Sequence, residues 1–213
     1  IDTYIQYAPQ LAGMEDAPGV TDVIVAPLFG NAAVVLLLVA PLITMRVLSE
    51  EKRNRTLTLL MSAPVSMTEI VLGKYLGVLG FFLAVLGLLM LMALSLFAGT
   101  TLDVGKLLSG LLGLTLVIGA FAAAGLYMSS LTEQPTIAAV SSFGLLLLLW
   151  IINWAGGSGE QVSGVFSYLS LVGHYDSLLK GLFNSTDVLY YLLFILTFLV
   201  LSIQRLDANR LPH

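Results

Sequence analysis

The sequence predicts an all-α fold, a polytopic membrane helical bundle with five spans in this chain. Of its 213 residues, 58% are hydrophobic and only 10% are charged, whereas about 25% of the residues in an ordinary soluble domain are charged. Apolar runs close to the roughly 20 residues that a helix needs to cross a bilayer recur along the chain. The runs are continuous and do not alternate with polar residues, so they predict helices, which satisfy their own backbone groups in lipid.

We expect the five spans to cover five apolar runs separated by polar or turn-forming residues. The runs are about Ala26 to Val47, Glu69 to Phe97, Leu107 to Met128, Pro135 to Trp154, and Val188 to Ile203. Residues 1–25 are predicted to be an extracytoplasmic segment, and residues 26–213 the transmembrane domain. The chain begins with Ile1 and lacks the basic flank and short apolar run of a signal peptide. We therefore expect a cleaved signal or a helix upstream, and favour a missing helix that makes six spans in the full protein.

Lys and Arg fall mainly on one side of the predicted bundle. Seven of the nine basic residues lie between the first two spans, at their ends, or after the last span: Arg46, Lys52, Arg53, Arg55, Lys74, Arg205 and Arg210. The opposite side carries only Lys106 and Lys180. Because cytoplasmic loops retain Lys and Arg, the cationic side is predicted to be cytoplasmic. The C-terminus then lies on the cytoplasmic side of a bacterial inner membrane.

The ionisable residues exclude several classes of function. With a net charge of -4 the chain has no basic patch for a nucleic acid, which clustered Lys and Arg would have to bind. It has no cysteine and only two histidines, so no metal site is expected. Apart from Arg46, Glu69 and Lys74, which lie within reach of the cytoplasmic interface, the five spans contain no Asp, Glu, Lys, Arg or His, and this absence disfavours an ion-coupled pump.

Signals for catalysis are also missing from the sequence. It contains no zinc-protease or hydrolase motif. The Gly73-Lys74 pair is followed by Tyr75 and lacks the upstream glycine of a phosphate-binding loop. The chain is therefore predicted not to be an enzyme and to bind no cofactor. If ATP is used, another chain binds and hydrolyses it.

Small residues recur inside two of the spans. The second span contains Gly73 and Gly77, a Gly-x-x-x-Gly pair, followed by Gly80 and Gly87. The third contains Gly110, Gly113, Gly119, Ala123 and Gly125. Such residues let helix backbones approach closely in lipid. Packing within the chain is the favoured interpretation, and a translocation gate or a dimer face is the alternative.

The segment from Arg46 to Lys74 is the most informative loop. It contains a solvated charge cluster at residues 50–55 and a short apolar piece at residues 56–61, and Pro64 then breaks the chain. Ser66 with Glu69 three residues later is a capping box that opens the next helix. A short cytoplasmic helix of this kind either lies on lipid or fills a groove in a partner. Physical arguments alone leave both possibilities open.

Residues 41–77, PLITMRVLSEEKRNRTLTLLMSAPVSMTEIVLGKYLG, resemble the signature of ABC-2 type transporter permeases. In these permeases a Glu-rich stretch, a Thr-Leu pair, a leucine pair and Pro-Val-Ser precede Ile-x-Leu-Gly-Lys. Residues 125–150 and 168–194 are similar to the gliding-motility-type branch of the family. Two residues depart from the pattern. Arg55 stands where the family usually has Gly, and Thr58 stands where relatives often have Glu.

The resemblance implies that this loop, at residues 48–68, is the coupling helix, which sits in a cleft of a separate ATP-binding subunit. The docking residues would be Glu51, Arg53, Thr56, Leu57, Leu60, Ser62, Ala63 and Pro64. Leu57 and Leu60 share a helix face and can enter an apolar groove, or alternatively bury in the chain's own bundle. A second contact would involve Leu131, Thr132 and Glu133. A plain turn is the alternative there.

The outer segment at residues 156–186 is predicted to be amphipathic and to lie at the outer interface. Its apolar residues recur at close to helical spacing, and relatives place re-entrant helices here. Tyr168 and Tyr175 suit the headgroup region. His174 and Asp176 are predicted to form a solvated interfacial pair and not a catalytic or metal site. The sequence Asn184-Ser185-Thr186 is expected to form the turn before the last helix.

Together these features predict the permease subunit of an ATP-binding cassette exporter. The implied partners are a separate ABC ATPase subunit, which binds the ATP, and membrane lipid. One coupling loop per chain predicts a second permease chain, identical or different, in the working unit. The alternative is a non-ABC polytopic carrier or a membrane scaffold of an envelope complex.

Overall fold

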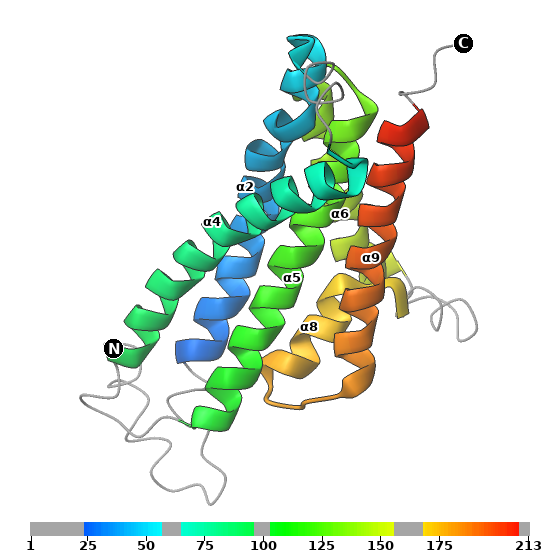
Figure 1. The fold of residues 1–213 in the computed structure, drawn as a ribbon. Coiled ribbons are helices and arrows are strands. Elements are labelled where there is room, and N and C mark those ends of the chain that lie inside the picture. Colours follow the sequence, from blue (N-terminus) through cyan, green and yellow to red (C-terminus); the bar gives the residue numbers. More distant parts are fainter. Residues whose placement is uncertain (1–23, 57–64, 96–102, 156–167, 209–213) are drawn as a thin grey trace, which may run out of the picture.

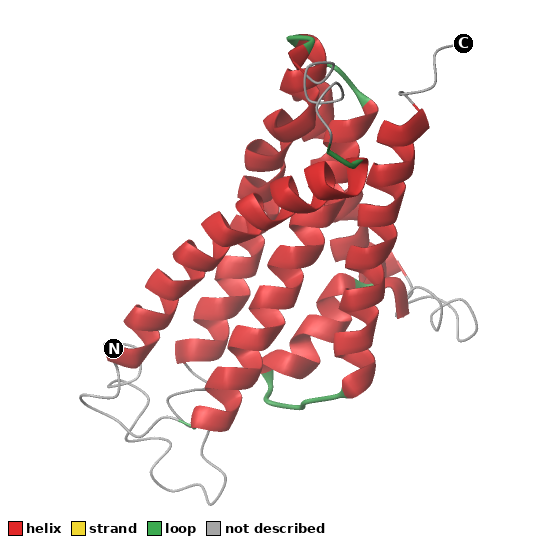
Figure 2. Ribbon diagram, in the orientation of Figure 1, coloured by secondary structure: helices red, strands yellow, loops and turns green. Residues whose placement is uncertain are grey.

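The computed structural model describes residues 24–56, 65–95, 103–155 and 168–208, and within these ranges the fold is a helical bundle with no strand (Figures 1 and 2). Its main helices are α2 (Ala26–Arg53), α4 (Met67–Ser95), α5 (Val104–Leu131), α6 (Pro135–Ala155), α8 (Leu171–Leu179) and α9 (Ser185–Ala208). Among the described residues, five helices are long and apolar enough to cross a membrane, and α8 is too short. The predicted all-α bundle with five spans is confirmed.

The helices extend beyond the predicted spans at most ends, and α2 shows the largest difference. It continues past Val47 to Arg53, so the charged residues 50–53 form its last turn and not a separate loop. No Gly or Pro interrupts this stretch, and charged side chains do not break a helix. Lys52 and Arg53 also lie beside the carbonyl end of the helix, where the helix dipole favours cations.

Local capping residues determine where two of the helices begin. The Glu69 carboxylate accepts a hydrogen bond from the Ser66 amide at 2.8 Å, and the Ser66 hydroxyl accepts one from the Glu69 amide at 3.2 Å. The predicted capping box is therefore confirmed. The side-chain oxygen of Asn184 accepts from the Thr186 amide at 3.2 Å, so the predicted turn before α9 is confirmed as well.

α5 lies at the centre of the bundle, and the middle of this helix is buried on every side. In its most apolar stretch 72% of the residues are buried, compared with 17% to 39% in the four other membrane-length helices that are described. Every residue from Val117 to Leu126, with the sequence VIGAFAAAGL, is buried. A helix that is apolar all round is expected to be buried, and small side chains let its neighbours approach. The helices α2, α4, α6, α8 and α9 all contact it (Figure 1).

The α5 glycines allow other elements to approach closely. A Cβ atom added at Gly113 would lie 2.9 Å from the Leu178 Cβ atom in α8. One added at Gly125 would lie 2.1 Å from the Thr44 hydroxyl oxygen in α2. Neither position has room for a methyl group, so these glycines serve packing within the chain, as the favoured interpretation predicts.

The α4 glycines have different surroundings. A Cβ atom added to any of them would meet no atom of the described residues within 4 Å, and all four positions are exposed: Gly73, Gly77, Gly80 and Gly87. Packing within the described part of the chain therefore does not account for them. The translocation gate and the dimer face stay the predicted roles of this row.

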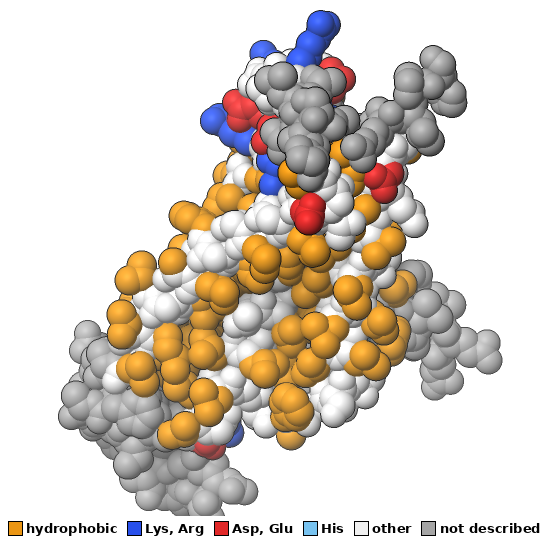
Figure 3. All heavy atoms as spheres, in the orientation of Figure 1, with side chains coloured by type: hydrophobic (Ala, Val, Ile, Leu, Met, Phe, Trp, Pro, Cys, Tyr) orange, Lys and Arg blue, Asp and Glu red, His pale blue; other side chains and the backbone are white. Residues whose placement is uncertain are grey.

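The exterior of the bundle is apolar between two charged ends. Large hydrophobic side chains are exposed on several membrane-length helices, for example Leu42, Leu76, Val140 and Leu196, and they cover much of the face shown in Figure 3. Lys and Arg gather at the end where α2 and α9 finish and α4 begins (Figure 3). We call this the cationic end. An apolar belt between polar ends is what a bundle in lipid requires.

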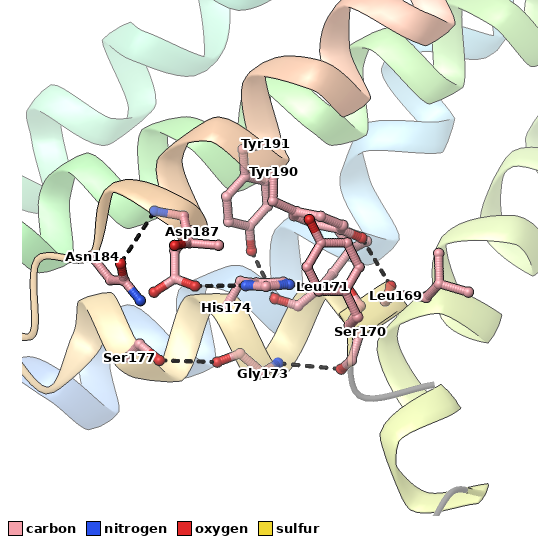
Figure 4. A network of polar contacts seen from close by, with 12 residues as sticks. Leu169, Ser170, Leu171, Gly173, His174, Ser177, Asn184, Asp187, Tyr190 and Tyr191 are labelled. Atoms are coloured by element: carbon pink, nitrogen blue, oxygen red, sulfur yellow. Dashed lines mark hydrogen bonds and ion pairs between the residues drawn. The ribbon is translucent and has the colours of Figure 1, made fainter. Parts of the chain in front are cut away.

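The short helix α8 lies at the opposite end of the bundle, and two expectations for it are wrong. Tyr175, expected in the headgroup region, is 2% exposed, and its hydroxyl donates to the Phe29 carbonyl at 2.9 Å. His174, expected to form a solvated pair with Asp176, instead contacts Asp187 of α9 at 2.6 Å (Figure 4). Asp176 is exposed. The reason is that α8 packs against α5, so that one face of the helix turns inward.

Gly125→Ala is expected to destabilise the protein, because the added methyl group overlaps Thr44 of α2. The two helices would have to separate, and overpacking of this kind costs about 1–3 kcal/mol. Gly77→Ala is the matched control, since it adds the same methyl group where space is open and removes an intrahelical glycine, a gain of roughly 0.5–1 kcal/mol. Thermal unfolding in detergent micelles measures both effects. Equal melting temperatures would contradict the close approach of α2 and α5.

Candidate functional site

α2 ends with a turn at Asn54 and Arg55. This turn lies inside the segment at residues 48–68 that is predicted to form the coupling helix, and we call this segment the docking loop. The Asn54 amide donates to the Glu50 carbonyl at 2.9 Å, and the Arg55 amide donates to the Lys52 carbonyl at 3.2 Å. Arg55 has a φ of 58°, which lies in the left-handed region that favours glycine. A left-handed residue just after the helix is a common way to end it. The backbone therefore has the glycine geometry that the permease signature implies, although the residue is Arg.

Lys74 of α4 connects the two flanks of the docking loop. Its ammonium nitrogen lies 2.5 Å from a Glu51 carboxylate oxygen and 2.8 Å from the Val47 carbonyl oxygen. The Lys74 and Glu51 side chains are 18% and 27% exposed, so solvent screens this ion pair less than one on the surface. The other carboxylate oxygen of Glu51 is buried and has no hydrogen-bond partner among the described residues. The end of α2 and the start of α4 thus form one unit.

The end of α5 is bound to the same part of α2 through Ser129. Its hydroxyl oxygen accepts hydrogen bonds from the Leu48 and Ser49 amides, at 3.1 and 3.0 Å. The same hydroxyl donates to the Met45 carbonyl at 2.9 Å. Since three backbone groups of α2 share this one side chain, α2 and α5 are held against both sliding and rotation at this point.

The turn between α5 and α6 lies beside the end of α2. The Lys52 ammonium group donates to the Ser130 carbonyl. Next to this contact is a hollow of about 430 Å³, which Arg53 lines from α2 and Glu133 and Gln134 line from the turn. The structure therefore brings together Arg53 of the predicted docking loop and Glu133 of the predicted second contact.

The other residues of the predicted second contact belong to the same turn. Leu131, the last residue of α5, is 40% exposed. The Thr132 hydroxyl accepts from the Gln134 amide at 3.1 Å, which stabilises the turn before α6. The turn is compact and local, as a plain turn would be, and it also presents an apolar side chain and a carboxylate next to Arg53.

Only part of the predicted docking surface is described. Arg53 and Thr56 are exposed, and the Thr56 hydroxyl donates to the Glu51 carbonyl at 3.3 Å. The remaining predicted residues, Leu57, Leu60, Ser62, Ala63 and Pro64, lie outside the described residues. For the two leucines, docking into a partner and burial in the chain's own bundle both stay predictions.

Sequence reasoning missed the residues that hold this end together. It uses Lys52 and Lys74 as charges that set the orientation and Lys74 as the last residue of the family signature, but it assigns no contact to either lysine or to Ser129. A signal exists, because lysines near the end of a span can bend toward polar groups at the interface. Most of their partners, however, are backbone carbonyl groups on other helices, and no residue pattern marks these.

Comparison with known families decides the relationship of the chain to other proteins. The family model described as "ABC-2 family transporter protein" matches residues 2–211. The chain belongs to the ABC-2 transporter family. A search of curated proteins and a search of solved structures each found no match.

The ABC-2 family consists of membrane components of transporters, which are not themselves catalytic. This ABC-2 protein is accordingly a multi-pass membrane protein with a transport role. Among its described residues, no group of three or more His, Cys, Asp or Glu side chains is arranged to hold a metal ion. The described residues that carry the permease signature lie in the last part of α2 and the first part of α4, and these two helix ends meet at the cationic end.

Arg55→Gly is expected to stabilise this ABC-2 protein by about 1 kcal/mol. A left-handed conformation costs a residue with a Cβ atom roughly 1–2 kcal/mol, whereas glycine adopts it without strain. Arg53→Gly is the matched control, because it places glycine in the last turn of α2, where a loss of about 1 kcal/mol is expected. Thermal unfolding in micelles distinguishes the two. A loss of stability in both variants would show that Arg55 is not left-handed.

Lys74→Met is expected to destabilise the protein by about 1–3 kcal/mol, the usual cost of leaving partly buried acceptors without a donor. The acceptors are the Glu51 carboxylate and the Val47 carbonyl. Lys180→Met, which removes an exposed lysine at the opposite end, is the control and is expected to have little effect. Adding Glu51→Gln to Lys74→Met should recover part of the loss. Thermal unfolding of the unmodified chain, Lys74→Met, Glu51→Gln alone and the double variant gives the coupling, and additive effects would rule out the ion pair.

Proposed function

We propose that this ABC-2 protein is the permease subunit of an ATP-binding cassette exporter. A separate ATPase subunit would bind and hydrolyse ATP and dock at the cationic end, and no cofactor would bind to the permease itself. The observation that carries the proposal is the construction of the cationic end. There the Lys74–Glu51 ion pair and the Ser129 hydroxyl join the flanks of the docking loop to α4 and α5.

A push on the docking loop would be transmitted through these contacts as rigid-body motion. The Lys74–Glu51 pair couples the end of α2 to the start of α4, and Ser129 couples α2 to α5. α5 contacts every other described helix named above. Close-packed interiors transmit displacement because they have few voids to absorb it. Motion at the loop is thus expected to shift several helices together.

The positions of the basic residues support one orientation of the protein in the membrane. Lys52, Arg53, Lys74 and Arg205 lie at the ends of helices that meet at the cationic end. By the positive-inside rule this end faces the cytoplasm, where ATP is available to the partner. The C-terminus would then be cytoplasmic, and α8 would lie on the outer side of a bacterial inner membrane.

One docking loop per chain supports a working unit of two permease chains, identical or different. The exposed α4 glycines offer one face on which a second chain can approach closely in lipid. We also propose that the protein belongs to the gliding-motility-type branch of the family. The segments at residues 125–150 and 168–194 support this placement.

The test is co-purification of the full chain with its ATPase subunit from membranes. Leu57→Glu with Leu60→Glu is expected to reduce the recovered ATPase at least tenfold, because two carboxylates cannot enter an apolar groove without a large desolvation cost. Permease-stimulated ATP hydrolysis should fall in parallel. Leu182→Glu is the matched control, since Leu182 is 64% exposed at the opposite end and should leave both readouts unchanged.

Unchanged ATPase recovery in the double variant would contradict the assignment of the docking loop. Failure of the unmodified chain to bind any ABC ATPase would favour the alternative, a non-ABC carrier or an envelope scaffold.

A further inference from the structure

Both ring nitrogens of His174 face oxygen atoms. Nδ1 lies 2.6 Å from a carboxylate oxygen of Asp187 (Figure 4), and Nε2 lies 2.9 Å from the Tyr168 carbonyl oxygen. A backbone carbonyl only accepts hydrogen bonds, so the contact at Nε2 requires a proton on that nitrogen. A neutral imidazole has one N–H group, and the Tyr168 carbonyl uses it.

The contact at Nδ1 then needs a second proton. An ionised carboxylate has only acceptor sites, and a deprotonated Nδ1 is also an acceptor. Two acceptors 2.6 Å apart would repel each other. The proton between them belongs either to an imidazolium facing a carboxylate or to a carboxylic acid facing a neutral imidazole. In both forms the His174–Asp187 pair holds one proton more than a neutral imidazole and a carboxylate.

Three features of the surroundings stabilise the form with an imidazolium and a carboxylate, whereas burial of both groups and the Asp187 Oδ2 atom, which has no hydrogen-bond partner among the described residues, oppose it. The His174 and Asp187 side chains are only 11% and 7% exposed, so their attraction is weakly screened. The Tyr190 ring stacks on the imidazole with 4.2 Å between centroids and 23° between planes, and an aromatic face attracts a cation. Asp187 lies in the first turn of α9, where the helix dipole favours a negative charge.

No other carboxylate competes for the imidazole among the described residues packed around it. α8 carries Asp176, which is exposed, and α9 carries Asp187 with the phenols of Tyr190 and Tyr191. The segment before α8 adds the Tyr168 phenol. Past the end of α8, Lys180 is exposed and Lys106 of α5 lies beside Gly181. α6 has no ionisable residue, and neither does α2 before Arg46.

The pair holds α8 and the residues before it against α9. The same junction contains the Tyr190 and Tyr191 hydroxyls, which donate to the Leu169 and Leu171 carbonyls at 2.8 and 2.7 Å (Figure 4). On its other side α8 is bound to α2 through Tyr175. A phenol carries its own donor proton, so the tyrosine contacts need no proton from solvent. The His174–Asp187 pair is thus the part of this junction whose contacts require one proton more than a neutral imidazole and a carboxylate supply.

We propose that His174 and Asp187 form a proton-binding site that controls how firmly α8 is held on α9. One proton is taken up from solvent when α8 docks in the observed arrangement. As the pH rises and the pair loses this proton, one of the two His174 contacts loses its hydrogen and α8 loosens. The stabilisation is therefore present at low pH and lost as pH increases. The site does not depend on the proposed exporter function.

The protonation state can be read directly from the full chain in lipid nanodiscs with ¹⁵N-labelled histidine. The chain contains only His174 and His213, and His213→Ala assigns the two sets of signals. Both ring nitrogens of His174 are expected to carry protons at a pH at which the His213 ring is neutral. Asp187→Asn should abolish this difference. Asp176→Asn, which removes the same charge two residues from His174, should preserve it.

The effect on α8 is measured by amide hydrogen exchange at residues 171–179, corrected for the intrinsic pH dependence. Protection is expected to fall roughly tenfold or more as the pH rises through the range in which the His174 signals lose the second ring proton, and tenfold is the order of one charge-assisted hydrogen bond. Asp187→Asn should remove this pH dependence, and Asp176→Asn should retain it. A His174 ring with one unprotonated nitrogen while α8 is protected would overturn the proposal, as would pH-independent protection. Both readouts apply to the unmodified chain, so a variant that fails to fold does not block the test.

Discussion

The close contact between α2 and α5 is the constraint on which the other contacts depend. Because Gly125 has no side chain, Thr44 fits against α5 and its hydroxyl donates to the Ala40 carbonyl of its own helix at 2.8 Å. About one turn further along α5, Ser129 then reaches the backbone of α2. A larger residue at position 125 would move α5 away and break the Ser129 contacts. The docking loop would then lose its connection to the helix at the centre of the bundle.

The same two helices also hold the opposite end of the molecule. The Ser109 hydroxyl of α5 donates to the Leu178 carbonyl at 2.8 Å, and Tyr175 of α8 donates to the Phe29 carbonyl of α2 at 2.9 Å. Burial raises the pKa of the Tyr175 hydroxyl, with a smaller contribution from Asp176, so Tyr175 stays a donor at any physiological pH. Interhelical hydrogen bonds in membranes contribute only about 0.6 kcal/mol each on average. Close packing around the α5 glycines therefore stabilises both ends more than these hydrogen bonds do.

The sequence predicted the features that depend on local chemistry or on the lipid. Hydropathy predicted the five spans because the bilayer requires long apolar helices, and the capping box needed only Ser66 and Glu69. Reasoning from the sequence failed where contacts join residues that are distant along the chain. His174 was assigned to Asp176, although residues two apart in a helix do not face each other, and its partner Asp187 lies on another helix. Both α4 and α5 contain several glycines, and their neighbours in space show which row serves packing within the described residues.

The two ends of the bundle use charges of different kinds, and this difference has a mechanical consequence. At the cationic end a lysine ammonium group faces a glutamate carboxylate, and a serine hydroxyl joins α2 to α5. These groups connect the docking loop to α4 and α5. At the opposite end, in the arrangement proposed above, the His174–Asp187 pair keeps both of its contacts only while it holds an extra proton. Motion that enters at the cationic end would thus reach α8, and the proton on the His174–Asp187 pair would determine how far α8 resists it.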